Sequence, residues 1–400
     1  MKKTIWPLGF VAGTMLALAP VVQVYGQGSV TLYGVIDAGI GYSNNVAPAL
    51  GGAGGHKFQL TSGVGTGTRF GLRGTEDLGG GNTALFVLEN GFSVANGTLL
   101  QGSRSFGRQA YAGLSNPRFG TLTFGRQYDS VVDFVSPFTA AKQWGTQYGA
   151  HVGDVDNLYN AFRINNSVKF TSQTWRGFTL GALYGFSNQA GGGSGNGFAN
   201  DRAWSVGTSY RLGGFSVGAG YLLVNNPSSG NTNGSNAGGA VAGDYTAATN
   251  IFYARPVTRQ AVVTAGAAYR FGQATAGLVY SHSKLDYTDR SSFDIHNIEA
   301  NLALRLQPAL VAGLAAIYSD GFVDGARGIT NVATTTHPRW LQINVGTDYS
   351  VSKRTDLYAA VVWQKAEAGA AVAAVDAVGG PTGAGGRYQI ATQLGLRSKF

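Results

Sequence analysis

Hydrophobic and polar residues alternate with a period of two along most of this chain. Near its start, Val30, Leu32 and Ile36 fall on one face, whereas Thr31 and Tyr33 fall on the other. This alternation predicts β-strands with one apolar face. The apolar face would meet a core in a soluble sandwich and lipid in a membrane barrel, and the period alone does not separate the two.

Sixteen segments carry the pattern, and most of them reach the length of about 9 to 11 residues with which a tilted strand crosses a bilayer. They span residues 29–42, 57–76, 82–96, 105–115, 120–127, 161–173, 178–187, 202–212, 215–225, 260–271, 274–285, 293–306, 310–319, 338–350, 355–366 and 387–400.

The connections between these segments alternate in length. Seven short turns, such as 213–214 and 272–273, alternate with eight longer polar or Gly-rich connections, of which 128–160 and 226–259 are the longest. Short turns at one end and long loops at the other are typical of up-and-down membrane barrels. We therefore predict an all-β fold, a transmembrane antiparallel up-and-down β-barrel of 16 strands around an aqueous lumen.

The first residues form a separate segment. Lys2 and Lys3 precede an apolar stretch from Leu8 to Val22, a pattern typical of a secretory signal peptide. We expect residues 1–26 to be a removable leader and residues 27–400 to form the barrel. No later run of 18 apolar residues could cross a membrane as a helix, so a spanning structure has to be a closed barrel.

Composition narrows the possible functions. Charged residues make up 12% of the chain and Cys is absent, which excludes disulfides and thiol chemistry. The five His residues lie far apart, without metal-ligand spacing. The segment Gly51–Lys57 lacks the Ser or Thr and the following helix of a phosphate-binding loop. We expect no enzymatic activity, no metal or cofactor, and no nucleic-acid partner.

Four local sequences resemble the general trimeric porins of Gram-negative outer membranes: GSVTLYGVIDAGI from Gly28, TRFGLRGTEDLGGGNTALFVLE from Thr68, RQAYAGLSNPRFGTLTFGRQYD from Arg108, and the terminal LGLRSKF. The resemblance implies a homotrimer in the outer membrane, held in lipid, with one water-filled pore per subunit. It also implies that the third long loop folds inward to form a constriction, where basic residues of the wall face acidic residues of the loop.

The alternation can be used to choose the wall residues. Arg69 and Arg73 alternate with the apolar Phe70 and Leu72, so they are expected to face the lumen. Arg108 is expected inside because it shares a face of small residues opposite Tyr111.

In the segment 161–173, Ile164, Val168 and Phe170 are expected to face lipid, which leaves Arg163 and Lys169 facing the lumen. Arg69, Arg108 and Arg163 also match the wall arginines of the resembled family. Arg126 ranks lower, because it shares the parity of Leu122 and Phe124. The candidate constriction wall is therefore Arg69, Arg73, Arg108, Arg163 and Lys169.

The third long connection, 128–160, supplies four candidate constriction acids: Asp129, Asp133, Asp154 and Asp156. Lys142 is its only Lys or Arg. Removing the leader with Lys2 and Lys3 lowers the formal net charge from +9 to +7, and rings of basic residues favour anions. We expect a passive diffusion channel for small hydrophilic solutes and inorganic ions with a weak to moderate anion preference. The alternatives are a substrate-specific channel and a surface-binding or adhesion barrel.

Overall fold

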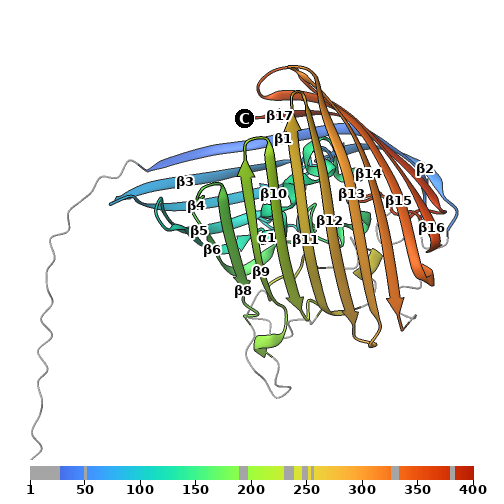
Figure 1. Ribbon diagram of the computed structural model, residues 1–400, viewed down its shortest axis with the longest axis horizontal. Helices are drawn as coiled ribbons and strands as arrows, with labels where there is room; N and C mark the ends of the chain where they lie inside the picture. The colour runs from blue at the N-terminus through green and yellow to red at the C-terminus, as the bar shows by residue number, and fades with distance from the viewer. Residues whose placement is uncertain are drawn as a thin grey trace, which may run out of the picture.

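The computed structural model describes residues 28–48, 52–188, 197–228, 238–245, 251–253, 256–325, 333–378 and 383–400. The strands form one antiparallel sheet that closes on itself into a barrel (Figure 1). They are β1 (Ser29–Val46), β2 (Gly55–Ser62), β3 (Arg69–Gly79), β4 (Asn82–Gly91), β5 (Gln109–Asn116), β6 (Gly120–Gln127), β7 (Ile164–Thr171), β8 (Phe178–Gly185), β9 (Arg202–Leu212), β10 (Phe215–Asn225), β11 (Val257–Phe271), β12 (Ala274–Tyr287), β13 (Ser292–Gln307), β14 (Leu310–Asp324), β15 (Ala333–Ser350), β16 (Thr355–Ala370) and β17 (Tyr388–Lys399).

Short helices lie in the loops. They are α1 (Ser130–Phe134), η1 (Ser136–Phe138), η2 (Ala141–Gly145), η3 (Gln147–Gly149), η4 (Val152–Asp154), η5 (Gly197–Ala199) and η6 (Ile251–Tyr253). No helix among the described residues is long and apolar enough to cross a membrane. The expected leader, residues 1–26, lies outside the described residues and stays a prediction.

The barrel has sixteen strand positions around its ring, as predicted, because β2 and β3 together occupy one of them. Both strands pair with β1, β2 along its second half and β3 along its first. The predicted continuous strand 57–76 was wrong in this one respect: residues 63–68 interrupt it. Thr68 holds the break, since its hydroxyl accepts from the Asp37 amide at 3.1 Å and donates to the Asp37 carbonyl at 2.9 Å.

The ring closes where β1 meets β17. Val35 to Ser43 pair with Lys399 to Ala391, and the Gly34 amide donates to the Phe400 carbonyl at 3.0 Å. A sheet closed into a ring pairs the backbone groups of neighbouring strands with one another, which is the condition for crossing lipid. The predicted fold class is confirmed.

The two faces of the sheet follow the alternation in sequence. On β12, Leu278 is 63% exposed, whereas Ser281 and Ser283 are fully buried against the contents of the barrel. On β17, Leu394 is 65% exposed and Gln389 is buried. An apolar outside and a polar inside are the arrangement of a barrel that stands in lipid. Trp340 faces inward and is 1% exposed.

At one end of the barrel the connections between strands are short, as expected. Seven turns of two to six residues join the strand pairs from β3–β4 to β15–β16. At the other end the connections are longer, except that β12 and β13 are joined by residues 288–291 alone. The expected long connection is short there because both strands keep pairing to their ends, with Asp286 opposite Ser292.

The third long connection, residues 128–163, folds into the barrel, and Figure 1 shows α1 inside the ring of strands. Its apolar side chains Val131, Phe134 and Phe138 are buried. Small residues on the inner face make room for this loop. A Cβ at Gly218 of β10 would lie 2.1 Å from the Phe134 carbonyl oxygen, and one at Gly313 of β14 would lie 2.0 Å from the Trp144 ring.

Candidate functional site

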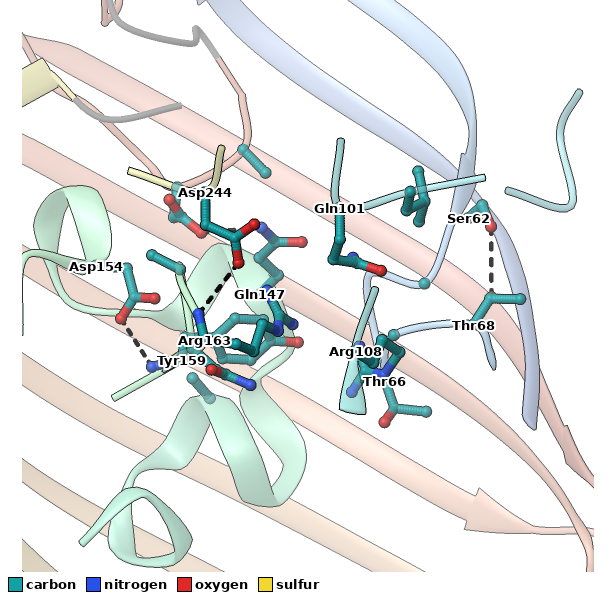
Figure 2. Close-up of a pocket in the computed structure, with 18 of the residues that line it drawn as sticks. Ser62, Thr66, Thr68, Gln101, Arg108, Gln147, Asp154, Tyr159, Arg163 and Asp244 are labelled. Atoms are coloured by element: carbon teal, nitrogen blue, oxygen red, sulfur yellow. Dashed lines mark hydrogen bonds between the residues drawn. The ribbon is translucent and has the colours of Figure 1, made fainter. Parts of the chain in front are cut away.

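The inward loop and the barrel wall enclose a cavity of about 760 Å³, which we call the constriction cavity (Figure 2). It is lined by the break between β2 and β3, by the inward loop, and by parts of three other long connections. Its charged lining residues are three cations, Arg108, Lys142 and Arg163, and three carboxylates, Asp154, Asp244 and Asp376.

Arg108 is held by a carboxylate of the wall. Its Nε lies 2.7 Å from Glu89 Oε1, and a terminal nitrogen donates to the Tyr128 hydroxyl at 3.0 Å. Arg69 lies on the other side of Glu89, at 3.4 Å from Nε to Oε2. Two arginines therefore share one acid, which leaves a net positive charge at this part of the wall.

The face assigned to Arg108 from sequence was wrong, although the residue does line the lumen cavity. Leu114 on β5 is 55% exposed, so it and the residues of its parity, including Ala112, face outward. Arg108 has the same parity, but it precedes β5, and its amide donates to the Glu89 carbonyl at 3.1 Å. Leaving the strand frees its side chain from the alternation.

Arg163 is the most deeply buried cation of the cavity. It is 7% exposed, and its Nε has no hydrogen-bond partner. Its amide donates to Asp244 at 3.2 Å, and its guanidinium lies 6.0 Å from the centre of the Tyr128 ring. Burial lowers the pKa of Arg163 to about 10, which still leaves it charged at neutral pH. Figure 2 shows Arg163 beside Asp244.

Lys142, like Arg163, reaches the cavity from the inward loop. Its Nζ donates to the Tyr159 carbonyl at 2.8 Å and lies 4.0 Å from the centre of the Tyr159 ring. The surrounding protein desolvates the Lys142 ammonium, and this effect, opposed by the charge of Asp154 and reinforced by those of Arg108 and Arg163, lowers the pKa of Lys142 to about 7. Burial also raises the pKa of Asp376 to about 6. The charge of the cavity therefore changes within the physiological pH range.

Of the five predicted cations, Arg69, Arg73 and Lys169 lie outside the cavity lining. Arg73 is exposed, and its guanidinium lies 5.4 Å from the centre of the Tyr33 ring. Lys169 forms an ion pair with Asp133 and donates to the Tyr128 carbonyl at 3.0 Å. Lys169 and Asp133 thus join the wall to the loop, and they neutralise each other.

Of the four predicted loop acids, only Asp154 lines the cavity. It accepts from the Tyr159 amide at 2.7 Å, and burial together with the charge of Asp156 raises the pKa of Asp154 well above its ordinary value. Asp129 caps α1 instead, because its Oδ1 accepts from the Val131 amide at 2.8 Å and its Oδ2 from Asn157 at 2.7 Å.

Asp156 belongs to an ionic cluster that anchors the loop to the wall. Its Oδ2 lies 2.5 Å from His151 Nδ1, and Nε2 of the same ring lies 3.2 Å from Glu299 of β13. Burial opposes a charged imidazole, but the charge and hydrogen bond of Asp156, with those of Glu299, outweigh it and raise the pKa of His151 to about 10. Glu299 also accepts from the Ala140 amide at 2.7 Å.

Arg126, ranked lower from sequence, points into the barrel. The pairing of β6 with β7 shifts register between Gly125 and Gln127, and Gly125 has a φ of 138°. Such a bulge reverses the alternation, so Arg126 reaches Asp244 at 2.5 Å. Arg104 forms an ion pair with the same carboxylate.

A second irregularity reverses Ile164, which was expected to face lipid and is fully buried. Asn166, two residues later, has a φ of 50°.

The sequence analysis missed three carboxylates of the site: Glu89, Asp244 and Asp376. Glu89 has a detectable signal, as a lone acid within an apolar strand. Asp244 and Asp376 lie in long connections, and no local sequence pattern predicts that these connections enter the lumen.

The closed sheet, the lipid-compatible exterior and the charged lumen define a transmembrane barrel of the porin class. Comparison with known proteins agrees: a model of the Gram-negative porin family matches residues 8–369. The chain belongs to this family, and the predicted family is confirmed. Gram-negative porins reside in the outer membrane, as predicted.

Two curated relatives are similar in sequence. An outer membrane porin protein of Bordetella pertussis is 39% identical over 47% of this chain, and the match spans about half, 49%, of the relative's length. Outer membrane porin protein 32 of Delftia acidovorans is 28% identical over the full length of both chains. A solved structure, the anion-selective porin from Comamonas acidovorans, superposes with a TM-score of 0.70 at 22% identity, covering 94% of this chain and 100% of that one.

Proposed function

We propose that the protein is a passive diffusion channel for small hydrophilic solutes and inorganic ions, with a weak to moderate preference for anions, and that it is not an enzyme. The supporting observation is the unbalanced charge around the constriction cavity. The cations there are Arg69, Arg104, Arg108, Arg126, Lys142 and Arg163, and the carboxylates are Glu89, Asp154, Asp244 and Asp376. Basic pore linings favour anions.

The anion preference that the Comamonas acidovorans porin carries in its name supports the same direction. The resemblance of the sequence to general trimeric porins supports a homotrimer, with outward apolar residues such as Leu32, Ile40 and Leu60 available to lipid or to another subunit. The leader is proposed to direct export.

Reversal potentials in a KCl gradient test the selectivity. The wild-type channel is expected to favour chloride, and Arg163→Gln to lower the chloride-to-potassium permeability ratio about twofold. A unit charge about 8 Å away in water contributes about 0.5 kcal/mol, which about 0.1 M salt screens to roughly half, and it acts with opposite sign on chloride and potassium. Arg259→Gln is the matched control, because Arg259 lies on the outward face of β11 and is 49% exposed at its side chain. A clear cation preference would overturn the proposal. Flux that saturates and is blocked by one solute would favour a substrate-specific channel, and an absence of conductance would favour a surface-binding barrel.

A further inference from the structure

Three strands end on the same local pattern at the short-turn end of the barrel, which in outer-membrane barrels is the periplasmic end. The patterns are Tyr210-Arg211-Leu212 on β9, Tyr269-Arg270-Phe271 on β11 and Leu304-Arg305-Leu306 on β13. In each, the residue after the Arg is an exposed large hydrophobic on the outer face: Leu212, Phe271 and Leu306. Side chains alternate along a strand, so each Arg turns to the inside.

The three arginines line one cavity of about 460 Å³, which we call the periplasmic cavity. The hydroxyl residues Ser216 and Thr275 also line it, and no carboxylate does. Within the described part of the chain, none of the three arginines forms an ion pair. Only Arg305 has a side-chain hydrogen bond there, to the Pro308 carbonyl at 3.2 Å.

This cavity is separate from the constriction. The two cavities share no lining residue. On β9, the inward loop is fixed at Ser205, whose hydroxyl accepts from the Ser130 amide at 3.0 Å. Arg211 lies six residues further along the same strand, which is about 20 Å at 3.3 Å per residue. At the Debye length of about 10 Å in 0.1 M salt, the charges of the two cavities act independently.

We propose that Arg211, Arg270 and Arg305 form a second anion-binding site at the periplasmic mouth, which binds oxyanions such as phosphates as they leave or enter the channel. The inference rests on the proposed function, because it needs anions to pass through the lumen. Guanidinium groups present paired N–H donors that match the oxygens of a phosphate. Three unpaired cations around one hollow also raise the local anion concentration, an effect that salt weakens.

The test uses inorganic pyrophosphate and the purified full-length protein in planar bilayers at 0.1 M KCl. Pyrophosphate added to the periplasmic compartment is expected to reduce the open-channel current. The triple variant R211Q/R270Q/R305Q is expected to raise the concentration of half-maximal block at least tenfold. Raising KCl to 1 M should remove the difference. Substitution of all three by Lys keeps the charge without the paired donors, and its half-block concentration should lie between the two.

The matched control is R118Q/R176Q/R354Q, which removes three cations from turns at the same end of the barrel. None of these residues lines the periplasmic cavity. The control should stay within twofold of the wild type. Equal shifts in the two triple variants would overturn the proposal in favour of diffuse rim charge, and so would an unshifted R211Q/R270Q/R305Q channel.

Reversal potentials on the same channels separate this inference from the proposed function. If the wild type favours chloride while pyrophosphate block is unchanged by R211Q/R270Q/R305Q, only the second site fails. If the wild type favours potassium, the proposed function itself fails. Stepwise conductance of normal size in the variant shows that the exposed substitutions have left the barrel folded.

Discussion

The two walls of the lumen differ in what they offer to the inward loop. The wall from β3 to β7 presents charges, with Arg69, Glu89 and Lys169 among them. The wall from β11 to β16 presents mostly uncharged amides that bind the loop backbone: Asn301 donates to the Phe138 carbonyl at 2.8 Å and Gln342 to the Ala150 carbonyl at 3.1 Å. The charges therefore gather on one wall, whereas the other wall holds the loop backbone through neutral amides.

Among the described residues, Glu299 is the ionic contact between the amide wall and the inward loop, and removing it should have the largest effect. Glu299→Ala leaves the Ala140 amide without its acceptor and His151 with one carboxylate in place of two. Breaking a buried ionic pair costs about 3 to 5 kcal/mol. Urea unfolding in detergent micelles should show this loss, together with noisier single-channel currents. Glu367→Gln, which removes an exposed pair with Lys365, should leave the free energy of unfolding nearly unchanged. Equal losses would show that Glu299 is no anchor.

The next effect concerns close packing on the same wall. Gly313→Val should displace Trp144, because even a Cβ at this position would lie 2.0 Å from its ring. Overpacking of this kind costs about 1 to 3 kcal/mol, and it should shift η2 and so change the unit conductance. Ala316→Val, on the outward face of the same strand, is the control. An unchanged conductance in Gly313→Val would mean that the loop is not held at this strand.

A change of pH should alter the charge of the constriction cavity. As pH rises from 5 to 9, Asp376 with its pKa of about 6 gains a negative charge, and Lys142 with its pKa of about 7 loses a positive one. Both changes make the cavity less positive, so the chloride preference should fall, by about fourfold for two unit charges about 8 Å away in water. Reversal potentials at pH 5, 7 and 9 measure this. The variant K142Q/D376N should show a smaller pH dependence than the wild type, with Asp154, whose pKa is also raised, left to titrate. A preference that rises with pH would contradict the assignment.

The smallest expected effect comes from the charged wall alone. Glu89→Gln leaves Arg69 and Arg108 without their shared carboxylate, so the chloride preference should increase about twofold by the same single-charge estimate. Unit conductance should hardly change, because the loop anchors are intact. Asp320→Asn on the outer face is the control. A large change in conductance with Glu89→Gln would break the division between the two walls.

Much of the barrel was predictable, because the period-two alternation can be read within each strand and is repeated in every strand. The turns such as 213–214 followed from the same pattern. Where the prediction of faces was wrong, an irregularity had intervened: the bulge at Gly125 turned Arg126 inward, and Ile164 lies beside Asn166, whose φ is positive. One extra residue in a strand moves every later side chain to the opposite face of the sheet. A sequence of small and polar residues does not reveal where such a residue is inserted.

The candidate site was predictable in kind but only partly in detail. Arg108 and Arg163 lie at the cavity, yet three of the four loop acids have other partners. Asp156, for example, meets Ser281 at 2.5 Å across 125 residues of sequence. Such contacts depend on how the loop docks, which only the assembled barrel decides. The roles of all these residues in conduction stay predictions until the channel is measured.

The seam between β1 and β17 has a consequence for biogenesis. Because the first and last strands are neighbours, a nascent chain cannot complete its ring until the final strand has been delivered, and every shorter intermediate exposes two unpaired edges. Unpaired edges recruit other strands and promote aggregation. Closure of the ring is therefore the last step of barrel assembly, and the two terminal strands need protection from other strand edges until it occurs.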